Sequence, residues 1–282
     1  MESDAKDPQV IAEPGQDSER GASNAFRVID RTMHILRCLS DHAAGLTLTE
    51  LSGTADLHKA TVARFLKALE RGGFVTVAPN KRWTVGPALL DIAARAQRRL
   101  DVRDVARPVM EEACRATNET VQMAILADES IAYIEKVEPP EQPLRINTQV
   151  GSRRPIHCNG LGKVLAAFHQ QPGEIERVLR SAGMQRATPQ TITSMSAFQE
   201  ELARIREKGY AVDDREYNEL VTCAAAPVRD STGRTIAGLS ISTIGVSVES
   251  ARFRELIDVA KESADRVSLA LGWNGGAHGD KP

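Results

Sequence analysis

The segment from Thr47 to Val75 constrains this chain more than any other. It holds two short runs with apolar residues at three- and four-residue spacing, separated by Asp56-Leu57-His58 and closed by Gly72-Gly73. Thr47-Leu-Thr-Glu50 has the pattern of a capping box, which starts a helix. Two short helices joined by so tight a turn predict a helix-turn-helix.

The second of these helices, predicted over about 59–71, has two distinct faces. Val62, Phe65, Leu66 and Leu69 repeat at helical spacing and are expected in the core. Residues 74–85 then alternate around a Pro-Asn turn, which predicts a hairpin, the wing of a winged helix. Polar residues of a recognition helix contact base edges, and Lys and Arg also reach phosphate. The candidate DNA-binding residues are therefore His58, Lys59, Thr61, Arg64 and Lys67 of the helix and Lys81 and Arg82 of the wing.

Charge is distributed unevenly along the chain. The whole sequence has a formal charge of −2, yet residues 24–100 carry twelve Lys and Arg against six Asp and Glu. The remaining segments are net acidic, so only the first module suits a polyanion. Two alternatives stay open, because an exposed basic helix face is often only solvated and trihelical units can also bind other proteins. Salt dependence discriminates between them, since phosphate contacts release counterions.

The length of 282 residues is sufficient for two domains. We expect disordered tails over 1–22 and 272–282, a DNA-binding domain over 23–86, a linker helix over 87–101 and a second domain over 102–271. The first helix is expected to start at Ser23 or Asn24. Its predicted buried face consists of Phe26, Val28, Ile29, Met33, Ile35, Leu36 and Leu39.

The second domain alternates predicted helices and strands in an α+β pattern. Helices are expected over 102–117, 161–169, 173–182, 196–208 and 250–271. Strands are expected over 120–127, 131–137, 144–147, 209–212, 221–228 and 234–243. Such an order predicts an antiparallel sheet flanked by helices, as in sensor domains.

The compartment is expected to be the cytoplasm. The four cysteines are scattered without a CxxC pair, which is typical of a reducing environment. The N-terminal residues are acidic and lack an apolar run, so no signal peptide is predicted. The sequence also lacks an apolar stretch of the length that crosses a bilayer.

Three further motifs give the chain a family resemblance. They are Arg154-Pro-Ile-His-Cys-Asn-Gly-Leu-Gly-Lys163, Gly209-Tyr-Ala-Val-Asp-Asp-Arg-Glu216 and Cys223-Ala-Ala-Ala-Pro-Val228. Together with the winged helix-turn-helix, their order and spacing resemble the IclR family of bacterial transcriptional regulators from about Asn24 to Leu271. The resemblance implies a regulator, most often a repressor, with a GAF-like C-terminal domain that binds a small effector. It also implies dimers, often paired into tetramers, and no cofactor.

The resemblance places an effector site in the second domain. Carried over by position, the site consists of Ile146, Arg154, Gly160, Leu161, Asp213, Val221, Cys223, Ser240 and Ser242. Ser240 and Ser242 alternate with apolar residues, so both hydroxyls are expected on one face of the sheet. Gly160 stands at a predicted helix N-terminus, where free N–H groups favour a carboxylate. A small organic acid is the expected effector, and the sequence does not specify which acid.

Two alternative functions concern some of the same residues. One alternative is a catalytic set made of His157, Cys158 and the carboxylates of Asp213, Asp214 and Glu216. The resemblance is only in composition, because no nucleophile signature surrounds these residues. His157, Cys158, Asp213 and Cys223 could instead converge on a metal, although the paired short spacing of structural zinc sites is missing. The sequence thus favours a regulator without a metal or a catalytic site.

Overall fold

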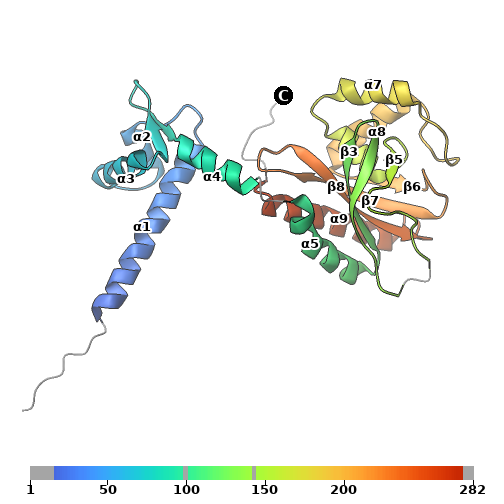
Figure 1. The fold of residues 1–282 in the computed structure, drawn as a ribbon, viewed down its shortest axis with the longest axis horizontal. Helices are drawn as coiled ribbons and strands as arrows, with labels where there is room; N and C mark the ends of the chain where they lie inside the picture. The colour runs from blue at the N-terminus through green and yellow to red at the C-terminus, as the bar shows by residue number, and fades with distance from the viewer. Residues whose placement is uncertain (1–15, 98–100, 142–143, 276–282) are drawn as a thin grey trace, which may run out of the picture. The chain divides into compact units, whose positions relative to one another are not determined.

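The computed structural model describes residues 16–97, 101–141 and 144–275, which form two compact units, residues 1–99 and 100–282 (Figure 1). The first unit has the predicted order of a winged helix-turn-helix. Its elements are α1 (Gln16–Ser40), α2 (Leu48–Thr54), α3 (Lys59–Arg71), β1 (Val75–Val77), β2 (Trp83–Val85) and α4 (Pro87–Gln97). The linker helix predicted over 87–101 corresponds to α4, with Pro87 at its first position, and residues 98–100 of the prediction lie outside the described residues.

Local capping explains why α2 begins where it does. The Glu50 N–H donates to the Thr47 hydroxyl at 3.3 Å, and the Thr47 N–H donates to a Glu50 carboxylate oxygen at 2.8 Å. This is the predicted capping box. The wing is held to the body by two bonds between Leu46 and Trp83, the Leu46 N–H donating at 3.0 Å and the Trp83 N–H at 2.7 Å. The core then closes over Ile35, Leu51 and Leu66.

The first helix differs from its prediction in two respects. It begins at Gln16, so residues 16–22 of the expected disordered tail are helical, and only residues 1–15 lie outside the described residues. The predicted buried face is also wrong in its first half. Phe26, Val28, Ile29 and Met33 are exposed, whereas Ile35 and Leu39 are buried. The small body formed by α2, α3 and the wing covers only the last part of α1, so periodicity alone overestimates the buried length.

The second unit contains one six-stranded antiparallel sheet with the strand order β5-β4-β3-β8-β7-β6. Its strands are β3 (Thr120–Ala127), β4 (Ser130–Val137), β5 (Arg153–Pro155), β6 (Ala211–Asp214), β7 (Val221–Arg229) and β8 (Thr235–Ile244). Its helices are α5 (Val102–Thr117), α6 (Gly160–Ala167), α7 (Pro172–Ala182), α8 (Met195–Lys208) and α9 (Ala251–Ala270). The predicted α+β class is confirmed.

Alternation along the central strands gives the sheet two apolar faces. Residues such as Met123, Ala224 and Leu239 pack against α5 and α9, while Ala124, Ala225 and Tyr133 face the cluster built on α6, α7 and α8. Helix α6 is buried along its whole length. A Cβ atom on Gly162 would lie 2.2 Å from the carbonyl oxygen of Ile156, so only glycine allows α6 to lie this close to the preceding segment.

Two details of the second unit correct the sequence analysis. Residues 144–147, expected as a strand, are irregular, because the Lys136 ammonium donates to the carbonyls of Ile146 and Thr148, both at 2.8 Å. Residues 153–155, which are in none of the expected strands, form the edge strand β5. The start of the expected C-terminal tail is also ordered: the Trp273 ring lies 5.0 Å from the Arg229 guanidinium, which also lies 5.1 Å from the Phe168 ring.

Candidate effector cavity and DNA-contacting face

A cavity of about 400 Å³ lies in the second unit, between the sheet and the N-terminus of α6. This volume is in the range of small-molecule sites. Nine of the lining residues are the predicted effector residues, namely Ile146, Arg154, Gly160, Leu161, Asp213, Val221, Cys223, Ser240 and Ser242. The structure therefore brings together every residue that the resemblance placed in the site.

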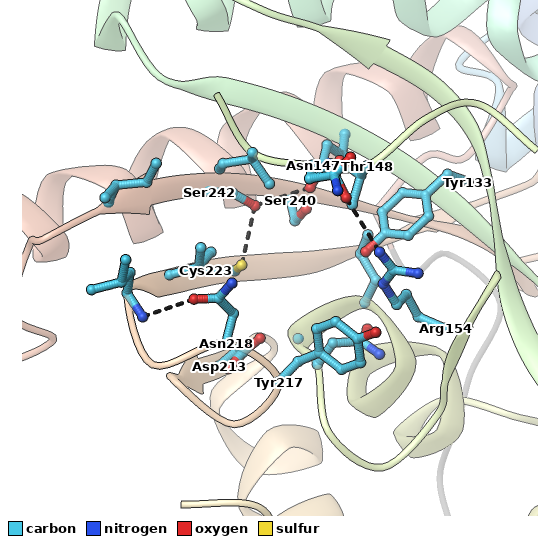
Figure 2. A pocket seen from close by; sticks show the side chains of 18 of the residues that line it. Tyr133, Asn147, Thr148, Arg154, Asp213, Tyr217, Asn218, Cys223, Ser240 and Ser242 are labelled. Atoms are coloured by element: carbon cyan, nitrogen blue, oxygen red, sulfur yellow. Dashed lines mark hydrogen bonds between the residues drawn. The ribbon is translucent and has the colours of Figure 1, made fainter. Parts of the chain in front are cut away.

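Strand register explains how residues distant in sequence reach one surface. Ser242 pairs with Thr120 on β3 and with Cys223 on β7, and Cys223 pairs with Asp213 on β6. Directly paired residues point to the same face of an antiparallel sheet, so this row crosses four strands on the cavity side. Ser240 and Gln122 form part of the next row on the same face. Figure 2 shows Ser240, Ser242, Cys223 and Asp213 around the cavity.

Most polar groups of this row already have partners. The Ser242 hydroxyl donates to the Gln122 side-chain oxygen at 3.1 Å and also lies 3.1 Å from Cys223 Sγ. Ser240, in the adjacent row, differs: the residue is 1% exposed and its hydroxyl has no hydrogen-bond partner within the described structure. A buried hydroxyl without a partner costs free energy, so Ser240 is suited to bind a polar group of a ligand.

The N-terminus of α6 borders the same cavity. Asn159 caps the helix by accepting the Gly162 N–H at 2.7 Å, while Gly160 and Leu161 line the cavity. The helix dipole adds a partial positive charge here. Burial raises the pKa of Tyr133 and that of the Cys223 thiol, so both groups stay protonated and uncharged at neutral pH. The inner cavity is thus rich in neutral donors.

Asp213 is the titratable carboxyl group of the cavity floor. Burial, followed by the nearby negative charge of Glu216, raises the pKa of Asp213 to about 7. Its carboxyl oxygen accepts the Glu216 N–H at 2.8 Å, which fixes its orientation. An acid protonated near neutral pH can donate a hydrogen bond to a ligand.

This raised pKa gives a prediction for stability. A carboxyl whose pKa is higher in the folded state stabilises the fold below its unfolded pKa, and that contribution is lost as pH rises through about 7. Ionisation of Asp213 should lower the free energy of unfolding of the wild type between about pH 4 and pH 7 by at most about 4 kcal/mol. The Asp213→Asn variant cannot ionise at this position, so its free energy of unfolding should lack this decrease. Urea unfolding of both proteins across this pH range measures it. The amide of the variant keeps an oxygen that can accept the Glu216 N–H, so the two proteins differ mainly in the titration of residue 213. Parallel pH profiles would therefore contradict the raised pKa of Asp213.

The sequence missed part of the cavity. Tyr133, Arg145, Tyr217 and Leu220 also line it, and none belongs to a motif that a single sequence reveals.

The catalytic and metal alternatives gain nothing from the geometry. Burial raises the pKa of the Cys158 thiol to about 12, so it is no thiolate nucleophile. Nowhere in the described parts of the chain do three His, Cys, Asp or Glu side chains converge as metal ligands, which removes support for the His157, Cys158, Asp213 and Cys223 set.

In the first unit, the predicted recognition face is open to solvent. His58, Lys59, Arg64 and Lys67 are exposed and Thr61 is half-buried on α3. Lys81 is exposed in the wing, with a positive φ of 61° at the turn. Arg82 differs, since its guanidinium donates to the Gly45 carbonyl at 2.7 Å and to the Glu50 carboxylate at 3.1 Å. Arg82 therefore braces the wing against α2, and its predicted DNA contact gains no support.

Comparison with known proteins identifies the two units. The description "Bacterial transcriptional regulator IclR C-terminal" matches residues 94–269, and "IclR helix-turn-helix domain" matches residues 28–79. The chain belongs to the IclR family. It is therefore a DNA-binding transcriptional regulator, and the winged helix-turn-helix is its DNA-binding module.

Full-length relatives of this IclR-family regulator agree. The transcriptional regulator BhcR of Paracoccus denitrificans is 32% identical over 88% of both chains. The DNA-binding transcriptional repressor YiaJ of Escherichia coli is 33% identical over 93% of both chains. The crystal structure of Thermotoga maritima IclR aligns with a TM-score of 0.57 at 28% identity, covering 88% of this chain and 100% of that one. No helix in the described parts of this regulator has the length and apolar character needed to cross a membrane.

Proposed function

We propose that this regulator is a cytoplasmic repressor whose hold on operator DNA is controlled by a small organic acid bound in the cavity of the second unit. The observation that carries the proposal is the cavity itself. It combines an unpartnered buried hydroxyl, Ser240, with the N-terminus of α6, Gly160 and Leu161. Uncharged donors that converge in a concave site suit a carboxylate. The relative YiaJ is a transcriptional repressor, which supports repression as the effect of DNA binding by this protein.

We assign DNA contacts to α3 and to the tip of the wing. His58, Lys59, Arg64 and Lys67 are exposed, Thr61 lies beside them, and Lys81 stands at the wing. Lys59, Arg64, Lys67 and Lys81 form no ion pair with another described residue, so their charges are available to phosphate. Base-edge contacts would come from the first turn of α3.

We further propose that the regulator acts as a homodimer, or a pair of dimers, through the apolar surface of its first unit. Phe26, Ile29 and Met33 on α1 and Leu90 and Ile92 on α4 are exposed, Phe26 by 68%. Large apolar side chains exposed on two helices of one unit are suited to contact another protein. Two copies would present two α3 helices to successive major grooves of a pseudo-palindromic operator. An effector that prefers one dimer arrangement then shifts DNA affinity.

One experiment tests the control by an acid. The full chain is mixed with operator fragments that it selects from genomic DNA, and panels of small organic acids are added in a gel-retardation assay. We expect at least one acid to release the DNA and to raise the melting temperature of the protein. Ser240→Ala should retain DNA binding but need about 5- to 20-fold more of that acid, because one donor is lost.

Ser263→Ala is the matched control, since Ser263 is equally buried but lies on α9, against the opposite face of the sheet. It should respond to the acid like the wild type. A panel in which no acid changes either the retardation or the melting temperature argues against acid control. Equal sensitivity of Ser240→Ala and the wild type would remove Ser240 from the site.

A further inference from the structure

The outer part of the cavity differs chemically from its floor. Its lining includes two guanidinium groups, Arg145 and Arg154, and three partly exposed apolar side chains, Leu144, Tyr217 and Leu220. The floor consists of Ser240, Asp213 and the N-terminus of α6. The cavity thus has a neutral donor-rich floor and a cationic mouth.

Neither arginine of the mouth forms an ion pair with a residue that the structure describes. The Arg154 side chain donates to two carbonyls, those of Arg153 at 3.1 Å and Asn147 at 3.2 Å, and lies 4.8 Å from the Tyr217 ring (Figure 2). Arg145 is exposed and makes no polar contact with the described residues. Elsewhere in this unit arginines are commonly paired with carboxylates, as Arg153 is with Asp128 at 3.1 Å. Two cations that share one cavity and lack a carboxylate partner within the described structure favour an anion between them.

The contacts of Arg154 also hold it in place. Its bond to Asn147 and its stacking on Tyr217 join three segments of the mouth: β5, the irregular residues 144–148 and the loop after β6. A guanidinium held on an aromatic face loses little entropy when it binds a planar carboxylate with two parallel hydrogen bonds. The surrounding apolar side chains favour a singly charged carboxylate over a doubly charged phosphate, because the dianion costs more to remove from water.

We infer that the effector is a dicarboxylate: one carboxylate binds at the α6 N-terminus and Ser240, and the second binds between Arg145 and Arg154 at the mouth. This inference rests on the proposed function and specifies the ligand class of the same site. Because the pKa of Asp213 is raised to about 7, its uncharged form is populated at neutral pH, and that form does not oppose the inner carboxylate. Arg145 and Arg154 are specificity-determining residues, because they read the second acid group.

The test compares straight-chain dicarboxylates, from malonate to pimelate, with monocarboxylates of equal carbon number. Binding to the full chain is measured by titration calorimetry, and release of operator DNA by gel retardation. We expect at least one dicarboxylate to bind tenfold or more tightly than its monocarboxylate. Arg154→Met and Arg145→Met should each reduce that ratio to about twofold or less, because dicarboxylate binding weakens more than monocarboxylate binding, and Arg154→Lys should restore part of it.

Arg153→Met is the matched control. Arg153 adjoins Arg154 on β5, so its side chain points to the other side of the strand, where it pairs with Asp128. It should retain the wild-type preference. The Arg145 side chain makes no polar contact with the described residues. Arg145→Met therefore removes the positive charge without breaking a described hydrogen bond or ion pair.

Three results would overturn the inference. Dicarboxylates and monocarboxylates could bind equally at every length, or the preference could persist in both methionine variants. In a third case, 3-phosphonopropionate could bind tenfold more tightly than succinate, which would assign the mouth to phosphate-like groups. Monocarboxylates that release DNA in a Ser240-dependent manner would leave the proposed function intact in all three cases, whereas failure of every acid would remove both.

Discussion

Replacing Lys163 by methionine should lower the free energy of unfolding of the second unit by about 3–5 kcal/mol. Lys163 is 1% exposed, and its ammonium group contacts the carboxylates of Glu216 and Glu201 and the carbonyl of Val212. Although burial opposes the charge, these carboxylates keep the pKa of Lys163 raised. Methionine removes the cation and leaves the buried Glu216 carboxylate without it.

Urea unfolding followed by circular dichroism measures this loss. The double variant Lys163→Met, Glu216→Gln should recover part of the stability, because it removes the carboxylate that was left uncompensated. Protonation of Glu216 neutralises the buried carboxylate that has lost its cation, and this neutralisation decreases as pH rises. The single variant should therefore be less destabilised at pH 5 than at pH 8. A loss below about 1 kcal/mol, or no recovery in the double variant, would show that the cluster contributes little.

Replacing Arg64 by alanine should weaken operator binding by at least about tenfold, or about 1.4 kcal/mol. Arg64 is exposed on α3 and forms no ion pair with the described residues, so its charge is available to DNA. In a dimer the substitution affects both copies. The slope of log affinity against log salt should also fall by about one for each phosphate that Arg64 neutralises in the wild type.

Fluorescence anisotropy with labelled operator DNA at several salt concentrations measures both quantities. Lys208→Ala is the control, because Lys208 carries the same charge at the end of α8, in the effector-binding unit. The thermal stability of Arg64→Ala should equal that of the wild type. Unchanged affinity and salt slope would mean that the recognition face of α3 has been misassigned.

The sequence was most informative where local signals and apolar periodicity agree. The capping box at Thr47 and Glu50 located α2, and the glycine pair at Gly72-Gly73 located the end of α3. The α+β class followed from strands with clear turns, such as the turn from Arg229 to Gly233. All nine candidate effector residues lie on one cavity, because the family motifs fix their register in the sheet.

Long-range contacts account for what the sequence did not reveal. Residues 144–147 have a strand-like pattern, but Lys136 on β4 binds the carbonyls of Ile146 and Thr148. Arg82 has the composition of a phosphate contact, yet Glu50 and Gly45 already hold it. Lys163 is one cation in an apolar helix, and its partners lie 38 and 53 residues away. Periodicity cannot represent any of these contacts.

The tight approach of Gly162 to Ile156 has a consequence for how this protein can acquire new ligands. Because even a methyl group at that position would overlap a carbonyl oxygen, the helix beneath the ligand cannot shift or be resurfaced without rebuilding the domain. Variation is tolerated only at the rim, where Arg145, Tyr217 and Leu220 stand on irregular segments. Under the proposed control by an acid, laboratory evolution toward a different effector should therefore yield substitutions around the entrance of the cavity, with its floor left as it is.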